Sequence, residues 1–197
     1  MPKLRIIGLT GGIATGKTTV AEYLASAYAL PILDADIYAR EAVQPGSPIL
    51  VNIVDRFGSE ILLPDARLNR SQLGEIIFSD PTERRWLESQ IHPYVRDRLQ
   101  AEQQALAQHP ILVMVVPLLF EAKMTDLVTE IWVVSCSQTT QRSRLSQRDR
   151  LTLAQAQARI DSQMPLTQKV AQAEVVLDNS ATLESLLQQV DAALGFR

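Results

Sequence analysis

Residues 11–18 read Gly-Gly-Ile-Ala-Thr-Gly-Lys-Thr, and they are the strongest indicator of the fold. It matches the phosphate-loop pattern G-x-x-x-x-G-K-[ST] at every fixed position. The preceding residues, 5–10, are apolar and bounded by glycine, which is typical of a buried strand. Residues 17–28, which follow the loop, carry apolar side chains at helical spacing. A strand, a glycine loop and a helix in this order predict a nucleoside triphosphate site.

Each part of this loop has a separable chemical role. Glycine lets the backbone curl so that successive N–H groups point at phosphate oxygens, and the following helix adds the positive end of its dipole. Lys17 is expected to reach the β- and γ-phosphates and to act in catalysis, and the Thr18 hydroxyl is expected to bind Mg²⁺. We therefore expect ATP and Mg²⁺ as cofactors, held by Gly12, Ile13, Ala14, Thr15, Gly16, Lys17, Thr18 and Thr19.

The rest of the chain alternates strand-like and helical segments. Strands alternating with helices of ordinary length indicate βαβ units around a parallel sheet. The predicted fold class is therefore α/β, a P-loop core whose parallel five-stranded sheet is flanked by helices. Its other strands are expected at residues 31–33, 111–116, 131–135 and 175–177, and helices at 137–147 and 183–194.

The stretch between the second and third strands is too long for one crossover. It carries helical patterns at residues 37–43, 49–57 and 71–78, and a long one from residue 81. Asp80 before Pro81 is a good helix start, because Asp can cap and Pro suits the first turn. We predict a helical subdomain inserted into the core.

Composition narrows the class of protein. The 197 residues carry a formal net charge of −3, which argues against a dedicated nucleic-acid binder. Cys136 is the only cysteine, so an intramolecular disulfide and a cysteine-based zinc cage are excluded. The longest apolar run, residues 111–120, is about half of a membrane span. We expect a cytoplasmic protein with a small-molecule substrate and neither nucleic acid nor membrane as partner; the oligomeric state stays open.

Two carboxylates follow the second strand, where open α/β sheets place ligands. On an extended segment, Asp34 and Asp36 point the same way. One can serve the Mg²⁺ shell, for which Asp34 is our candidate, and the other can accept the proton of an attacking hydroxyl. The alternative is that either residue only caps the next helix. Arg40, one helical turn on, is either an acceptor-phosphate ligand or a surface arginine.

Four arginines occur within nine residues, 142–150, of an otherwise acidic chain. Arginines on a mobile segment can close over ATP and neutralise charge on the transferred phosphoryl group. We predict a lid at about residues 137–170 and expect Arg144 and Arg148, which share a helix face, to touch phosphate. A solvated basic face is the alternative. The core then comprises residues 1–35, 110–136 and 171–197, and the helical insert about 36–109.

Taken together, the motifs resemble the dephospho-CoA kinase family. The phosphate loop is common to many families, but the other matching segments, in this order, are far more specific. The matches run to about residue 187, nearly the whole chain. They are the loop with its strand at 7–20, D-A-D-x-x-A-R at 34–40, His-Pro at 92–93, P-L-L-x-E at 117–121, Gln-Arg-Asp at 147–149, Q-M-P-L at 163–166 and Val-Leu-Asp-Asn-Ser at 176–180.

The resemblance implies a kinase with a core, a helical CoA-binding domain and a lid. It implies transfer of the ATP γ-phosphoryl group to the 3′-hydroxyl of dephospho-CoA. By position, Asp36 would be the base, Arg40 and His92 would lie in the acceptor site, and Asn179 would lie near the adenine. His92 as a helix-bend residue and Asn179 as a turn former are the alternatives.

One departure concerns the metal. Many members have Asp where this chain has Val116, which leaves Asp34, Asp36 and Glu121 as acidic candidates near Mg²⁺. Glu121 could equally cap a helix. Two other functions stay open: a kinase of the nucleoside monophosphate type, and an ATP-binding regulatory module without catalysis.

Overall fold

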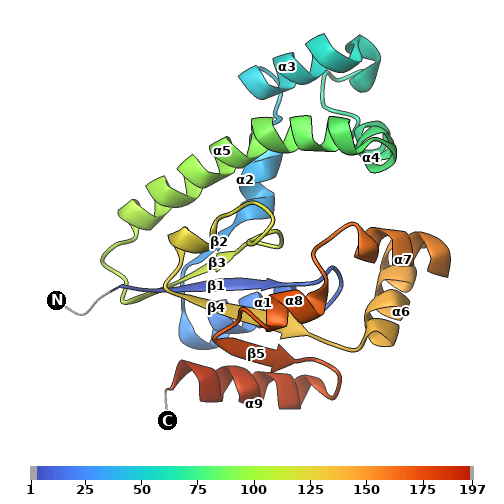
Figure 1. Ribbon diagram of the computed structural model, residues 1–197. Helices are drawn as coiled ribbons and strands as arrows, with labels where there is room; N and C mark the ends of the chain where they lie inside the picture. The colour runs from blue at the N-terminus through green and yellow to red at the C-terminus, as the bar shows by residue number, and fades with distance from the viewer. Residues whose placement is uncertain (1–3, 196–197) are drawn as a thin grey trace. The chain divides into compact units, whose positions relative to one another are not determined.

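The computed structural model describes residues 4–195 (Figure 1). Its contacts divide the chain into two compact units. One is built from both ends of the chain, up to Asp34 and from Glu102 onward, and the other is the continuous segment Ala35–Ala101.

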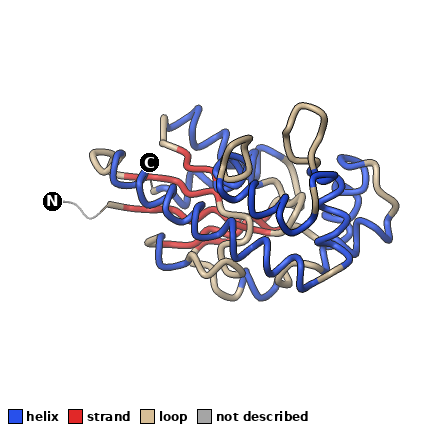
Figure 2. Tube along the Cα trace, turned by 90° about the horizontal axis from the view of Figure 1, so that it is seen from above, coloured by secondary structure: helices blue, strands red, loops and turns tan. Residues whose placement is uncertain are grey.

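The first unit is built on a sheet of five parallel strands. Figure 2 shows the strands side by side. The predicted α/β class and all five predicted strands are confirmed. The strands lie in the order β2-β3-β1-β4-β5, and their bounds are β1 (Arg5–Gly11), β2 (Ile32–Asp34), β3 (Ile111–Val115), β4 (Glu130–Ser135) and β5 (Val175–Asp178).

The first strand lies at the centre of this sheet. Ile7 pairs with Val113 of β3, and Leu9 pairs with Trp132 of β4. Two helices, α1 (Lys17–Tyr28) and α9 (Leu183–Leu194), pack their apolar faces on these strands, and Figure 1 shows α9 beside β5. The strands are apolar runs because they are covered by other elements, as parallel sheets require. This packing fixes the carboxyl end of β1, where the phosphate loop begins.

Three helices join β4 to β5. They are α6 (Gln138–Asp149), α7 (Leu153–Asp161) and α8 (Leu166–Val170). The Ser137 hydroxyl accepts a hydrogen bond from the N–H of Thr140, and Thr152 with Gln155 forms a capping box, so α6 and α7 begin at side-chain caps. The short helix α8 was not predicted, because five residues are too few to show a periodicity.

The second unit is helical, as predicted. Its helices are α2 (Ala35–Glu41), α3 (Pro48–Phe57), α4 (Arg70–Ser79) and most of α5 (Pro81–Ala105). The expected helix start at Asp80 is confirmed, because its side chain accepts hydrogen bonds from the N–H groups of Thr82 and Glu83. Ile53 and Ile61, both fully buried, belong to the apolar core of this unit. This unit also contains a short 3₁₀ helix, η1 (Ser59–Ile61). A second 3₁₀ helix, η2 (Thr125–Leu127), belongs to the first unit.

Along residues 4–195, no helix combines the length and the apolar character that crossing a bilayer requires.

Candidate active site

The phosphate loop connects the central strand to α1, in the predicted order. Its backbone enters the left-handed region at Ala14, with a φ of 59°, and Gly16 has a φ of 106°. A Cβ atom at Gly16 would lie 2.2 Å from Nδ2 of Asn179, so both the backbone and the space require glycine there. α1 begins at Lys17 with no side-chain cap, which leaves its first N–H groups directed at the loop.

Two side chains of the loop donate hydrogen bonds to the same backbone carbonyl, that of Gly12. The Gly12 oxygen accepts from Nζ of Lys17 at 2.7 Å and from the Thr15 hydroxyl at 2.9 Å. Nζ of Lys17 also lies 3.4 Å from the Gly11 oxygen. The ammonium group is therefore held at the mouth of a curled backbone, next to the N–H groups that such a loop offers to phosphate.

Three amide side chains hold the loop from outside. Nε2 of Gln141 donates to the Ile13 oxygen at 2.8 Å, and Oε1 of Gln163 accepts from the N–H of Ile13 at 3.1 Å. Nδ2 of Asn179 donates to the Thr15 oxygen at 2.8 Å. Asn179 was expected near the adenine, and the roles of the two glutamines were not predicted, because each glutamine contact spans more than 120 residues.

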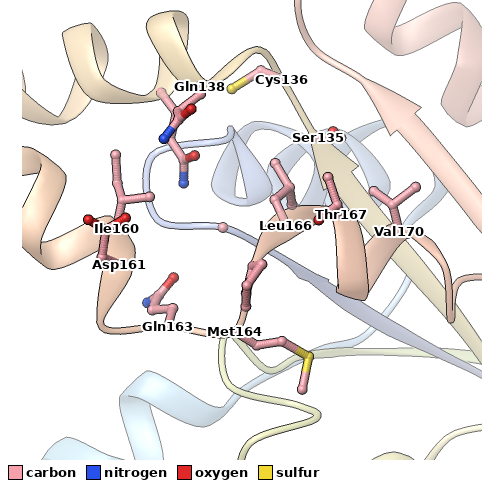
Figure 3. A pocket seen from close by; sticks show the side chains of 13 residues that line it. Ser135, Cys136, Gln138, Ile160, Asp161, Gln163, Met164, Leu166, Thr167 and Val170 are labelled. Atoms are coloured by element: carbon pink, nitrogen blue, oxygen red, sulfur yellow. The ribbon is translucent and has the colours of Figure 1, made fainter.

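A cavity of about 520 Å³ lies beside the loop (Figure 3). This is the usual size of a small-molecule pocket. In Figure 3, Ile160 lies on one side of the cavity and Val170 on the other. Cys136 also lines the cavity. Burial raises the pKa of its thiol, the charge of Arg144 lowers this pKa, and the charge of Asp178 raises it further. The thiol therefore stays protonated near neutral pH and is a poor nucleophile.

The arginines of α6 and α7, where a lid was expected, differ in their surroundings. Arg148 on α6 and Arg159 on α7 both pair with the carboxylate of Asp149, at 2.8 and 3.0 Å. The Arg148 hydrogen bond, opposed by burial, lowers the pKa of Asp149, and Arg159 adds to the effect. Among the described residues, Arg144 makes no ion pair. Asp149 thus pairs with two guanidinium groups from neighbouring helices, whereas the N–H donors of Arg144 can bind a ligand.

Glu121 has a structural partner. Its Oε1 lies 2.9 Å from Nζ of Lys169, which is fully buried, and accepts from the N–H of Met164 at 3.0 Å. Nζ of Lys169 also donates to the Pro117 oxygen at 3.0 Å. These contacts fasten α8 to the loop after β3, and they occupy one of the two carboxylate oxygens of Glu121.

The acidic pair differs from its prediction. Asp34 ends β2 as expected, but α2 begins at Ala35, so Asp36 lies in a first helical turn and not on an extended segment. A carboxylate is favoured there by the positive end of the helix dipole. The assumption of an extended segment, from which a shared direction of the two carboxylates was expected, is therefore wrong. Val116, next to this edge of the sheet, is buried and its N–H bonds to the Leu9 oxygen.

The predicted acceptor residues belong to the helical unit. Arg40, in the last turn of α2, is exposed, and Nη2 of Arg70 lies 3.4 Å from its backbone oxygen. Burial and then the charge of Arg40 lower the pKa of Arg70. Neither arginine has an ion pair within residues 4–195, so the two form an uncompensated cationic cluster. His92 lies on α5, where burial lowers its pKa against the opposing charge of Glu88.

The residues at the carboxyl edge of the sheet fit a magnesium ion that is held mainly by phosphate and water. Along the described chain, no three side chains of His, Cys, Asp or Glu gather into a metal site. Mg²⁺ in phosphate-transfer sites takes only one or two protein ligands and completes its shell with phosphate oxygens and water. Thr18, in the first turn of α1, and Asp34, at the same edge of the sheet, suit that arrangement.

Comparisons with known proteins agree on one family. The family model described as dephospho-CoA kinase matches residues 5–185. A dephospho-CoA kinase from Trichormus variabilis is 67% identical over 98% of this chain and 97% of its own length. A crystal structure of a Thermus thermophilus protein is 32% identical, covers 98% of this chain and 97% of that one, and has a TM-score of 0.80. A Campylobacter jejuni dephospho-CoA kinase is 26% identical, with coverages of 96% and 95% and a TM-score of 0.71.

Proposed function

The chain belongs to the dephospho-CoA kinase family, and from that premise we propose that it transfers the γ-phosphoryl group of ATP to the 3′-hydroxyl of the dephospho-CoA ribose. The products are CoA and ADP, and the proposed location is the cytoplasm. The observation that carries the proposal is the family match, which spans the phosphate loop, the helical unit and the lid segment in one continuous stretch.

The nucleotide side of the proposal uses the first unit. The loop N–H groups and Lys17 hold the β- and γ-phosphates, and Thr18 and Asp34 supply the protein ligands of Mg²⁺. When bound, the metal neutralises charge on the phosphate oxygens. Asn179 is proposed to lie near the adenine, and its buried side chain, bonded to Thr15, supports a place beside the nucleotide.

The acceptor side uses the helical unit. Asp36 is the proposed base that accepts the proton of the 3′-hydroxyl. Arg40 and His92 are the proposed acceptor ligands, and the cationic cluster of Arg40 with Arg70 supports them, because two guanidinium groups without a carboxylate suit the phosphates of dephospho-CoA. Arg144 and Arg148 are the proposed lid contacts, and their guanidinium groups would neutralise charge on the transferred group.

The first experiment follows ADP formation from ATP and Mg²⁺ with dephospho-CoA, AMP, CMP, adenosine or no acceptor. We expect ADP release that depends on dephospho-CoA alone, with CoA identified by mass as the second product. Release with AMP or CMP would make the chain a nucleoside monophosphate kinase. Release with none of these acceptors, while ATP still binds, would support a regulatory module.

Two substitutions then test the assigned roles. Asp36→Asn should remove most turnover and leave ATP affinity near the wild-type value, because only the proton acceptor is lost. Asp55→Asn, an exposed carboxylate on α3 of the same unit, is the matched control and should keep full turnover. Lys17→Ala should weaken ATP binding and transfer together. Near-normal turnover of Asp36→Asn would refute its role as the base.

A further inference from the structure

Two glutamine side chains hold the two backbone groups of one loop residue, Ile13. Gln141, from α6, donates to its carbonyl, and Gln163, between α7 and α8, accepts from its N–H. The amide orientations follow from the partners, because a carbonyl only accepts and an N–H only donates. The Gln141 residue is only 3% exposed, so this contact is shielded from competing water.

The geometry of the peptide bond extends this effect to the neighbouring groups. In a trans peptide, the C=O of one residue and the N–H of the next point in opposite directions. The Ile13 C=O is directed at Gln141, so the N–H of Ala14 points away from Gln141. The Ile13 N–H is directed at Gln163, so the Gly12 C=O points away from Gln163 and meets Lys17. The two glutamines thus fix the directions in which the backbone C=O and N–H groups of residues 12–14 point.

Two features of the loop agree with this reading. Ala14 has a φ of 59°, which an L-residue adopts only where its surroundings hold it. A Cβ atom at Gly12 would lie 2.4 Å from Nε2 of Gln141. Position 12 is variable in the phosphate-loop pattern, so the pattern does not call for glycine there. A side chain at position 12 would instead have to displace the Gln141 amide.

We propose that Gln141 and Gln163 are positioning residues of the triphosphate site, which hold Ile13 so that the N–H of Ala14 is directed at phosphate oxygens. Both come from the segment between β4 and β5, so they also connect the lid to the loop. The inference rests on the proposed function only in taking ATP as the nucleotide. It needs no acceptor, so its test is independent of dephospho-CoA.

The test measures equilibrium binding of ATP and of adenosine by displacement of a fluorescent ATP analogue. Gln141→Met keeps the length of the side chain and removes its donor. We expect ATP affinity to fall about tenfold or more, since a misdirected N–H loses a charge-assisted hydrogen bond, and adenosine affinity to change by less than about twofold. Gln163→Met should act in the same direction. Gln147→Met, exposed on the same helix, is the matched control and should bind ATP normally.

A second route uses Gly12→Ala, whose added methyl group displaces the Gln141 amide. We expect a loss of ATP affinity similar to that of Gln141→Met. The double variant should show no further loss, because both changes break the same hydrogen bond, from Gln141 to the Ile13 oxygen. A purely structural role would lower the unfolding midpoint and weaken ATP and adenosine alike. Wild-type ATP affinity in Gln141→Met, equal losses for both ligands, or additive losses in the double variant would overturn the proposal.

Discussion

Substitution of the buried lysine of α8 tests how the segment between β4 and β5 is fastened to the rest of the unit. Lys169 is fully buried, and its ammonium group has two acceptors, Oε1 of Glu121 at 2.9 Å and the Pro117 oxygen at 3.0 Å. Oε2 of Glu121 has no hydrogen-bond partner within the described structure. Lys169→Met keeps most of the side-chain volume but removes the charge, so a carboxylate is left without its cation.

The expected loss follows from the desolvation of that carboxylate. Removal of one partner of a buried ion pair typically costs about 3–5 kcal/mol, because the remaining charge is uncompensated. The Glu121 side chain keeps 24% of its surface exposed, so we expect the lower end, about 3 kcal/mol. The double variant Glu121→Gln with Lys169→Met leaves no charge behind. It should lose only about 1–2 kcal/mol, the worth of one or two hydrogen bonds.

Urea unfolding followed by circular dichroism gives the free energies of unfolding for the two variants. Gln168→Met, the adjacent exposed residue of α8, is the matched control and should change stability by less than about 0.5 kcal/mol. The reasoning fails if Lys169→Met loses less than about 1 kcal/mol, or if the double variant is no more stable than the single one.

Three further predictions concern other parts of the chain. Ile53→Ala should lower the free energy of unfolding by about 2–5 kcal/mol in urea titrations, because a fully buried side chain leaves a cavity; a loss under 1 kcal/mol would contradict this. The pKa of His92 in the folded chain lies below its ordinary value of 6.5, so just below pH 6.5 the unfolded chain binds more protons than the folded chain does. Stability should therefore fall as the pH drops below 6.5 in pH-dependent unfolding, and His92→Gln should reduce that slope. Asp191 accepts hydrogen bonds from both Tyr23 and Tyr28, which raises the pKa of Tyr28 to about 12 and that of Tyr23 above its ordinary value. Tyrosinate absorbance should therefore show late ionisations for these two residues, which Asp191→Asn brings earlier.

The sequence was sufficient for most of the architecture. Each strand of the sheet is an apolar run of four to seven residues, apart from the three-residue β2, and such runs are visible without knowledge of the fold. The strand–loop–helix unit at Gly11–Lys17 was predicted from local residues, because the loop pattern reflects local backbone geometry. Helices long enough to show a period were found for the same reason.

Contacts between distant segments could not be predicted. Gln141, Gln163 and Lys169 are polar residues in a segment that favours a solvated lid, yet each is aimed at a backbone group far away in the chain. Asp36 was misplaced for a local reason. Three residues of β2 give no signal for where the strand stops, and a helix that begins directly at Ala35 leaves no turn residues between them.

The central position of β1 has a consequence for synthesis on the ribosome. Both neighbours of this strand, at Ile111–Val115 and Glu130–Ser135, are translated more than a hundred residues after it. At about 5–20 residues per second, the nascent chain carries an apolar strand with two open edges for roughly 5–20 seconds. The helical unit, Ala35–Ala101, is contiguous and can fold during that interval. The segment that will hold the nucleotide is thus translated before its sheet neighbours and can become ordered only after they emerge. Until then the open strand edges expose the chain to aggregation, and a chaperone would be of most use in that interval.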